Sequence, residues 1–546
     1  MQYVEALLRQ LPPFPYAPTA LVLILFFIAV ASHRIILTPL HNVPGPWYAA
    51  ISDLWFTFHV LRLRRCRAIN DLLTKHGPIV RVTPNRVIFN DINVMKSVYG
   101  VRNRLNKSTF YKCLQTNAND HAMTVVEHEL HLVRKRGYAS HYLPTNLSLF
   151  QREIYDTIHE FIGVIDRTSQ TPELRSIDTL LLFRHFLIDI NCLHILGYRN
   201  HSLKAWEQKL LGRGPLDPLA RAMGDFPKRG FLKSILPNWF WCLLELIPIK
   251  RWQIFCESDV FLGHFVSERL HAIRALNTSR VKMVDGEVKS LLMRLMEHSY
   301  SIHERMPDAD IVSECQGHLI AGTDTLSTTL SYILWEVSRR PDVKARLQEE
   351  IFERIPNSSE DLFMPDLDAL RHLPYLDAVI KEGLRLYTAA PSPLERVAPD
   401  SLGGNEFSIL GYTIPPGTII ASQAWSSHRD PNIFTDPEQF IPGRWLSSTT
   451  VAESGQDNFL ESRQKEMSAR MHPFGYGPRV CGGQNLAQIL LRAVLVAIVR
   501  CFDVVPAEGT DEKSMAIRDS FVIFPAAMEC KLIFIPRLTS APTPLN

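Results

Sequence analysis

The chain has 546 residues, of which 46% are hydrophobic and 21% are charged, and this excludes a small module, a disordered tail and a fibrous repeat. Its 59 basic and 56 acidic residues give a net charge of +3, which lacks the strongly basic character of a nucleic-acid-binding domain. Nine scattered cysteines without C-x-x-C spacing predict reduced thiols rather than a disulfide framework or a zinc site.

An apolar segment near the N-terminus predicts a membrane anchor. No charged residue occurs from Gln10 to Ser32, and about 20 apolar residues are enough to cross a bilayer core. We expect an anchor at residues 1–36 with a single transmembrane helix at about residues 17–36.

A cleaved signal peptide is the alternative, because Ala29-Val30-Ala31 resembles a cleavage site. Against it, the leading region carries only Arg9 beside Glu5, whereas four arginines gather at residues 62–67 behind the segment. Positive charge behind an anchor favours a cytosolic domain. In that orientation the Asn-x-Ser sequons, such as the one at Asn106, are chance matches.

The rest of the chain predicts an elbow and one large domain. Residues 37–47 end in V-P-G-P-W, whose two prolines disfavour helix and stiffen the connection. No repeat or second linker follows, so residues 48–546 are expected to form one domain around a large cofactor.

Helical patterns dominate this domain, and we expect a mainly α fold with small β-sheets. A proline-free stretch at residues 308–340 predicts a helix of about 50 Å that crosses the domain. Short strands are expected at residues 79–82, 413–420 and 527–535.

The most specific segment is F-G-Y-G-P-R-V-C-G-G at residues 474–483. Its glycines allow tight turns and a close approach of the backbone to a flat ligand. Cys481 stands just before an apolar helical pattern at residues 486–499, and the N–H groups of a helix start lower the pKa of a thiol. We therefore expect a thiolate that binds a redox-active iron.

These residues match F-x-x-G-x-R-x-C-x-G, the haem-thiolate signature of the cytochrome P450 family, which this chain resembles. The resemblance implies the predominantly helical α+β cytochrome P450 fold. In that fold, haem b lies between a long central helix and the cysteine loop, and Cys481 is the proximal iron ligand. Gly482 departs from the family's small or branched aliphatic residue, and we expect looser packing beneath the iron.

Residues 382–385, E-G-L-R, match the family's E-x-x-R pattern, whose two charged residues share one helix face. The loop P-E-Q-F-I-P-G-R-W at residues 437–445 follows, with Gly443 in place of the family's usual Glu. The resemblance implies that Arg444 completes a buried Glu–Arg–Arg triad, whose role is structural: it holds the cysteine loop in register.

A third motif, A-G-T-D-T at residues 321–325, lies inside the long helix. Gly and Thr together open a helix locally, which indicates that something must fit there. The motif matches the family's oxygen-activating groove. By resemblance, Thr325 hydrogen-bonds the dioxygen and Asp324 delivers protons from water, and these two are the expected catalytic residues.

Haem propionates need cationic or N–H partners. By resemblance, the W-x-x-x-R position of the family holds H-x-x-x-K here, and it remains open whether Arg134 or Lys135 reaches a propionate. The full cofactor-binding set implied by the resemblance is His131, Lys135, Arg396, Phe474, Arg479 and Cys481, with Cys481 as the metal ligand.

The resemblance implies a membrane-anchored monooxygenase of the endoplasmic reticulum with a cytosolic catalytic domain. Electrons would come from NADPH through NADPH-cytochrome P450 reductase, with cytochrome b5 as an additional candidate donor, and a basic patch at Arg463, Lys465 and Arg470 is a candidate docking site. A reductase-independent isomerase or dehydratase and a non-catalytic haem-binding protein are the alternatives.

The substrate is expected to be small and lipophilic, such as a terpenoid, alkaloid or polyketide intermediate of fungal secondary metabolism. Two apolar segments are candidates for contact with it: residues 239–244, which could also dip into a membrane surface, and the turn at residues 521–524, which by resemblance lies over the haem.

Overall fold

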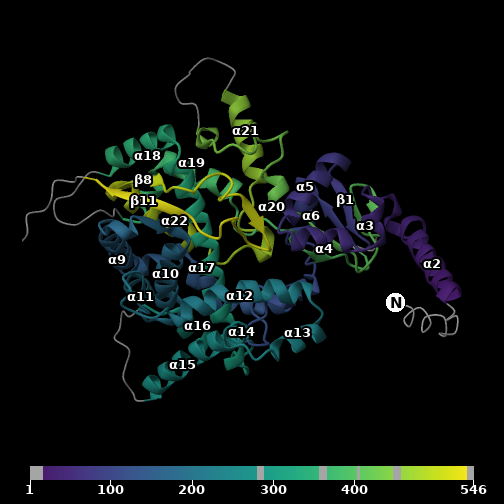
Figure 1. The fold of residues 1–546 in the computed structure, drawn as a ribbon, viewed down its shortest axis with the longest axis horizontal. Coiled ribbons are helices and arrows are strands. Elements are labelled where there is room, and N and C mark those ends of the chain that lie inside the picture. Colours follow the sequence, from purple (N-terminus) through teal and green to yellow (C-terminus); the bar gives the residue numbers. More distant parts are fainter. Residues whose placement is uncertain (1–15, 279–287, 356–365, 402–405, 447–456, 538–546) are drawn as a thin grey trace, which may run out of the picture.

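A computed structural model describes residues 16–278, 288–355, 366–401, 406–446 and 457–537. Helices surround a long central helix, α17 (Asp308–Ser338), as the proline-free stretch predicted. The largest apolar core cluster, to which α17 contributes, also takes residues from α9 (Gln151–Ser169), α10 (Thr179–Asn191), α19 (Pro374–Leu386) and α22 (Gln484–Cys501). The mainly α architecture with small sheets agrees with the expected fold class (Figure 1).

Shorter helices complete the domain around this core. They are α3 (Trp47–Ile51), α4 (Leu54–Leu61), α5 (Arg65–His76), α6 (Ile92–Tyr99), η3 (Thr109–Leu114), α7 (His128–Ala139), α8 (Pro144–Leu147), α11 (Ser202–Leu210), α12 (Pro218–Ile235), α13 (Asn238–Glu245), α14 (Lys250–Cys256), α15 (Ser258–Thr278), α16 (Leu291–Glu297), α18 (Pro341–Arg354), α20 (Ala424–Ser427) and α21 (Asp457–Arg470).

Four small sheets lie at the edges of the helical body. The first has the order β1 (Ile79–Thr83), β2 (Arg86–Phe89), β7 (Ile419–Ala421), β4 (Arg396–Val397), and the second has the order β3 (Ser176–Asp178), β11 (Lys531–Pro536), β8 (Phe502–Pro506). The others are the antiparallel pairs of β9 (Ile517–Asp519) with β10 (Ile523–Pro525) and of β5 (Ser408–Ile409) with β6 (Tyr412–Thr413).

The strand at residues 79–82 is confirmed, whereas the other two strand predictions are wrong in extent. Instead of one strand at residues 413–420, β6 ends at Thr413 and β7 begins at Ile419. Two prolines and Gly417, which has a φ of 76°, form a turn between them. The last strand begins at Lys531 rather than at residue 527, because Met528 has a φ of 59° and ends a turn.

The N-terminal apolar segment forms α2 (Tyr16–Ser32), which continues into the π-helical turn η1 (His33–Leu37). Residues Thr19–Leu37 have a mean hydropathy of 2.5, and none of them is buried. Two other described helical segments, Thr179–Leu196 and Gln484–Cys501, are also long and apolar enough to cross a membrane, but they are largely buried inside the domain.

The elbow after this helix packs on the first sheet. The N–H of Arg81 donates to the carbonyl of Pro44 at 2.7 Å, and a side chain at Gly45 would collide with the Arg81 carbonyl. The Arg81 guanidinium donates to the carbonyl of Arg34 at 3.0 Å, and Arg34 in turn hydrogen-bonds the carbonyl of Ile51. The end of the apolar helix, at Arg34, and the elbow, at Pro44, are therefore both hydrogen-bonded to the domain.

The E-x-x-R motif forms the buried triad that the resemblance implied. Both side chains are fully buried, and the Arg385 guanidinium donates to Glu382 at 2.9 and 2.8 Å. Arg444 Nε donates to the same carboxylate at 3.1 Å, and Trp445 Nε1 does so at 2.9 Å. Burial alone would raise the pKa of Glu382, but the bonds from Arg385 and Arg444 hold it below its ordinary value.

The triad is linked to the cysteine loop through one histidine. Arg385 Nη1 donates to the carbonyl of His428 at 2.9 Å, and His428 Nε2 accepts from the N–H of His472 at 2.9 Å. His472 lies two residues before Phe474, where the signature segment begins. The network therefore fixes the start of that segment.

Replacing Arg385 by Met should lower the free energy of unfolding by about 3–5 kcal/mol, because it leaves the Glu382 carboxylate buried without its main partner. Arg371→Met removes another i,i+3 pair, with Asp368, whose side chains are 50% and 78% exposed, and it should cost under about 1 kcal/mol. Chemical denaturation checks both variants. Equal effects would contradict the structural role of the triad.

Candidate functional site

The signature segment folds as a tight loop that leads into α22. The N–H of Cys481 donates to the carbonyl of Phe474 at 2.8 Å and closes the loop. Gly477 has a φ of 70°, and a Cβ there would collide with the carbonyl oxygen of Tyr99. Glycine is therefore required at this position by both conformation and space.

The Cys481 thiol lies at the N-terminal end of α22, where the N–H groups of Gly483 and Gln484 point to it and Lys135 lies nearby. These groups favour the thiolate, but dense surroundings outweigh them and raise the pKa of the thiol. The helix start therefore acts in the expected direction, but the net pKa of the thiol is raised because burial has the larger effect. The side chain nevertheless remains accessible, whereas five of the other cysteines are buried.

All nine cysteines are free, as the sequence predicted. Cys242 is exposed on α13 and is not a core thiol.

Gly482 does not loosen the packing next to the cysteine, contrary to the sequence-based expectation. A Cβ at this position would lie 2.7 Å from Cε2 of Tyr138, a buried residue of α7. The aromatic ring fills the volume that an aliphatic side chain at position 482 would need. Gly443 is the other departure from the family pattern. A Cβ at this position would have no neighbour within 4 Å, so a larger side chain would fit there without a clash.

Three buried or half-buried cations gather beside the cysteine loop: Lys107, Arg396 and Arg479. Burial and the two neighbouring arginines lower the pKa of Lys107, and burial followed by Arg396 lowers the pKa of Arg479 to about 10. None of the three makes an ion pair with a carboxylate in the described part of the chain. Glu395, the nearest acid in sequence, pairs with Arg86 at 3.2 Å.

Lys107 was missed by the sequence analysis. It lies outside every signature motif, and only the fold brings it to the two arginines. Its Nζ donates to the carbonyl of Met123 at 2.5 Å and lies 4.2 Å from the centre of the Tyr111 ring. A lysine that is 7% exposed and lacks a carboxylate partner among the described residues indicates a site for an anion.

The H-x-x-x-K segment of α7 points in two directions. Arg134 pairs with Asp310 at 2.6 Å and Glu314 at 3.5 Å on α17, whereas Lys135 Nζ donates to the carbonyl of Pro478 in the cysteine loop at 2.6 Å. Arg134 therefore forms ion pairs with the central helix, whereas Lys135 contacts the cysteine loop.

His131, four residues before Lys135, is buried among these cations. Burial, followed by Arg479 and Lys107, lowers the pKa of His131 to about 2, so the ring is neutral at pH 7. Its Nδ1 is buried without a hydrogen-bond partner in the described residues. The ring can therefore serve as a hydrogen-bond group but not as a charge.

The A-G-T-D-T motif does not break α17. Thr323 and Thr325 donate their hydroxyls to the carbonyls one turn earlier, at 2.8 and 2.7 Å, and the helix continues. Space beside Gly322 is taken by the amide of Asn191, which also donates to Thr323 Oγ1 at 3.1 Å. The local opening expected in α17 is therefore not empty beside Gly322, because Asn191 of α10 fills it. Ala321, the preceding residue, remains exposed.

Asp324 is held by a second residue of α10. Arg184 Nε donates to Asp324 Oδ1 at 3.0 Å, with the arginine side chain 26% exposed and the aspartate 14% exposed. The sequence analysis did not identify Arg184, because nothing in the local pattern distinguishes it from a surface cation. It orients the carboxylate of the proposed proton donor.

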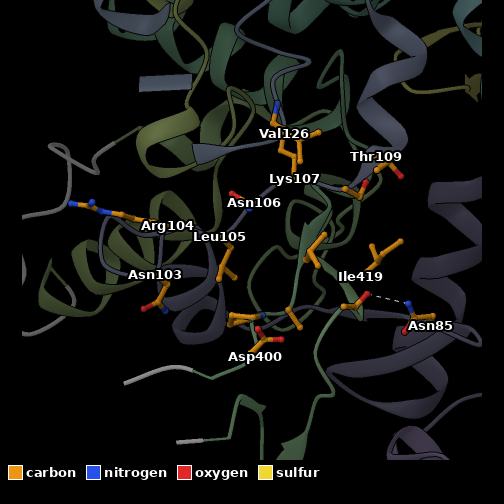
Figure 2. A pocket seen from close by; sticks show the side chains of 15 residues that line it. Asn85, Asn103, Arg104, Leu105, Asn106, Lys107, Thr109, Val126, Asp400 and Ile419 are labelled. Carbon is orange, nitrogen blue, oxygen red and sulfur yellow. Dashed lines mark hydrogen bonds between the residues drawn. The ribbon is translucent and has the colours of Figure 1, made fainter. Parts of the chain in front are cut away.

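A pocket of about 660 Å³ opens next to the cation group and does not include Cys481, Asp324 or Thr325. Figure 2 shows Lys107 near Val126 at one end and Asp400 at the other. The Val126 carbonyl accepts from Arg479 Nη2 at 2.8 Å, so this end adjoins the cations. The pocket has a mixed polar and apolar lining and lies beside the site rather than containing it.

The model of the cytochrome P450 family matches residues 51–532 of this chain. Similar curated proteins include the cytochrome P450 monooxygenase stcB of Emericella nidulans, 28% identical over 89% of this chain and 86% of the relative. Others are the cytochrome P450 monooxygenase aflV of Aspergillus parasiticus, 26% identical over 91% of each chain, and the benzoate 4-monooxygenase bphA of Aspergillus niger, 28% identical over 90% of this chain and 92% of the relative.

The chain belongs to the cytochrome P450 family. It is a haem-thiolate monooxygenase that uses haem and, through a redox partner, electrons from NADPH. The residues present fit haem. The accessible thiol of Cys481 is a suitable iron ligand. The cations that lack carboxylate partners in the described part of the chain, and Nδ1 of His131, could bind the carboxylates of the macrocycle.

Gly482→Ala should lower the free energy of unfolding by about 1–3 kcal/mol, because the new methyl group overlaps the Tyr138 ring. The matched control is Gly483→Ala, whose Cβ would lie 3.9 Å from the nearest atom, on Tyr142, and it should change stability less. Thermal unfolding checks the pair. Adding Tyr138→Ala to Gly482→Ala should remove the clash, and a strictly additive loss in the double variant would contradict this packing.

Proposed function

We propose that Cys481 is the axial thiolate ligand of the haem iron and that the neighbouring side chains hold the macrocycle. The accessible thiol, the N–H groups of Gly483 and Gln484 and the closed loop support this assignment. The proposed cofactor-binding residues are His131, Lys135, Arg396, Phe474, Arg479 and Cys481.

The propionates are proposed to lie at the cation group. Arg396 and Arg479 are near each other without carboxylate partners in the described chain, and a bound carboxylate would relieve their mutual repulsion. Lys107 joins them in this proposal, and neutral His131 contributes a hydrogen bond. Lys135 acts through the loop, because its ammonium holds the carbonyl of Pro478.

Asp324 and Thr325 are proposed to deliver protons to the reacting oxygen. Haem, when bound, supplies oxygen activation and the oxidation of the substrate. Arg184 fixes the Asp324 carboxylate from α10, so one oxygen of the carboxylate is engaged and the other can exchange protons with water. The Thr325 hydroxyl donates to the Ala321 carbonyl at rest, and rotation about χ1 lets it donate to a ligand instead.

The substrate is proposed to be a small lipophilic molecule of fungal secondary metabolism, such as a terpenoid, alkaloid or polyketide intermediate. The similar monooxygenases named above come from fungi. Half-buried Phe110 and Phe521 face each other with ring centres 5.9 Å apart, and they offer an aromatic surface between η3 and the β9–β10 turn.

The chain is proposed to be a single-pass protein of the endoplasmic reticulum membrane, with residues 1–36 as anchor, 37–47 as elbow and 48–546 as cytosolic catalytic domain. A fully unburied apolar helix supports the anchor. Apolar side chains of α13 and the loop after it, among them Trp239 at 67% and Leu246 at 74% exposure, offer a second membrane contact. Trp241 of the same helix is buried, so only part of residues 239–244 is available.

NADPH-cytochrome P450 reductase is the proposed electron donor, with cytochrome b5 as a second candidate. Of the basic patch before the cysteine loop, Arg463 and Arg470 are half-buried and engaged with Thr435 and Asp430, while Lys465 is exposed. Exposed Arg136 of α7 lies next in sequence to Lys135, which contacts the loop. Lys465 and Arg136 are therefore the proposed cations of the docking face.

The observation that carries the proposal is the accessible thiol at the start of α22. Cys481→Ala should abolish the red-shifted Soret band of the reduced carbon monoxide adduct, because no other thiolate is available at the loop. Cys501→Ala, a substitution in a half-buried cysteine at the other end of α22, is the control and should keep the band. A band that survives in Cys481→Ala would overturn the ligand assignment.

Thr325→Ala should lower product formation per NADPH by about 10²-fold, because proton delivery to the reacting oxygen fails while electron delivery continues. The electrons should then appear as hydrogen peroxide. Thr329→Ala removes a hydroxyl that makes the same bond one turn further along, to the Thr325 carbonyl at 3.0 Å, and should have little effect on this ratio. Product and NADPH are measured together. An unchanged ratio in Thr325→Ala would contradict the proposed proton delivery, and product formed without NADPH would favour a reductase-independent isomerase or dehydratase.

A further inference from the structure

Arg65, the first residue of α5, is a buried cation without an ionic partner among the described residues. The residue is 5% exposed, and its Nε is buried without a hydrogen bond. No side-chain hydrogen bond or ion pair of this guanidinium is found in the part of the chain that the structure describes. A desolvated charge that lacks a partner is costly, so it indicates a ligand or a functional role.

Asp519, an acid that interacts electrostatically with Arg65, already accepts hydrogen bonds from the backbone. Its carboxylate accepts from the N–H of Cys66 at 3.2 and 3.3 Å and caps the start of α5. Burial raises the pKa of Asp519, and the charge of Arg65 opposes this only in part. No ion pair between the two side chains is found among the described residues. Asp519 therefore serves the backbone of α5, and the arginine side chain is left without it.

Two aromatic rings flank the guanidinium instead. Arg65 Cζ lies 5.9 Å from the ring centres of both Phe56 and Phe110. Rings at this distance stabilise a cation through their faces but leave the N–H edges unsatisfied. The free Nη edge of the guanidinium is the part that matches a carboxylate.

Phe110 connects this cation to the candidate site. Its ring centre is 5.9 Å from that of Phe521, and Phe521 is 6.3 Å from Tyr111, whose ring carries the Lys107 ammonium at 4.2 Å. Arg65 is therefore separated from the cation group of the site by a short aromatic path. The path consists of aromatic rings and has a cation at each end, Arg65 at one and Lys107 at the other.

We propose that Arg65 binds the carboxylate of an amphiphilic carboxylic acid whose apolar body lies along Phe110 and Phe521. This inference rests on the proposed function, of which it specifies the substrate class. The carboxylate sets the orientation of the molecule, and the distance from it to the reacting carbon then selects the position that is oxidised. A neutral molecule of the same shape loses this anchoring interaction.

Two pairs of probes test the proposal on the full-length protein: dodecanoic acid against dodecanamide, and 2-naphthoic acid against 2-naphthamide. Equilibrium dialysis at pH 7.5 measures binding without relying on a haem signal. For the wild type, at least one acid should bind about tenfold more tightly than its amide, the size of one charge-assisted hydrogen-bonded pair. If both amides bind as tightly as their acids, the proposal is wrong.

Arg65→Gln should remove this preference, whereas Arg65→Lys should keep part of it because the charge remains. The matched control is Arg67→Gln, which removes the same charge from an exposed position of the same helix and should leave the preference intact. A preference that survives in Arg65→Gln, or that disappears equally in Arg67→Gln, would overturn the assignment to Arg65. The wild-type comparison decides the substrate class even if Arg65→Gln does not fold.

The same protein samples are tested for the red-shifted Soret band of the reduced carbon monoxide adduct. A missing band with an intact preference for the acid would count against the proposed function and leave the Arg65 site standing. An intact band without a preference would count against the Arg65 site alone.

Discussion

The cysteine loop depends on one fully buried carboxylate. Glu382 accepts from two arginines, one tryptophan and the N–H of Ile441, so every lone pair of a desolvated anion is used. Removing two or more charges from water is expensive, and a hydrophobic cluster of equal volume would stabilise a helix pair as well. What the charged cluster adds is directionality, because its hydrogen bonds join α19 to residues 441–445 and only one arrangement of the two segments satisfies all of them.

Departures from the family pattern are compensated by neighbours that the sequence does not place together. The ring of Tyr138 on α7 occupies the space that a side chain at Gly482, just before α22, would need. Neutral His131 stands among cations where the family has a tryptophan, and its pKa of about 2 means that it adds no further repulsion to them. In a closely packed core, a change in the size of one side chain is best tolerated when a neighbour compensates for it, because the total volume is then kept.

Much of the fold and the family could be predicted from the sequence, because periodic apolar patterns and a ten-residue signature act locally. The central helix, the cysteine loop and the Glu–Arg–Arg triad are of this kind. Lys107, Arg184 and Arg65 could not be predicted, since each is an ordinary basic residue until a distant element buries it. The lowering effect of the helix start on the pKa of the Cys481 thiol could be predicted from the sequence, whereas the burial that outweighs it could not.

In the proposed membrane orientation, the attachment of the N-terminal helix would let bilayer thickness act on the domain. Residues Thr19–Leu37 rise about 28 Å as a helix, slightly less than the hydrocarbon core of a typical bilayer. A thicker or thinner membrane changes the tilt of such a helix. Because Arg34 and Arg81 join the end of this helix to α3 and β1, a change of tilt would rotate the domain and alter the depth at which α13, the proposed second membrane contact, meets the lipid surface. Lipid composition would thereby set how easily an amphiphile moves from the membrane into the protein.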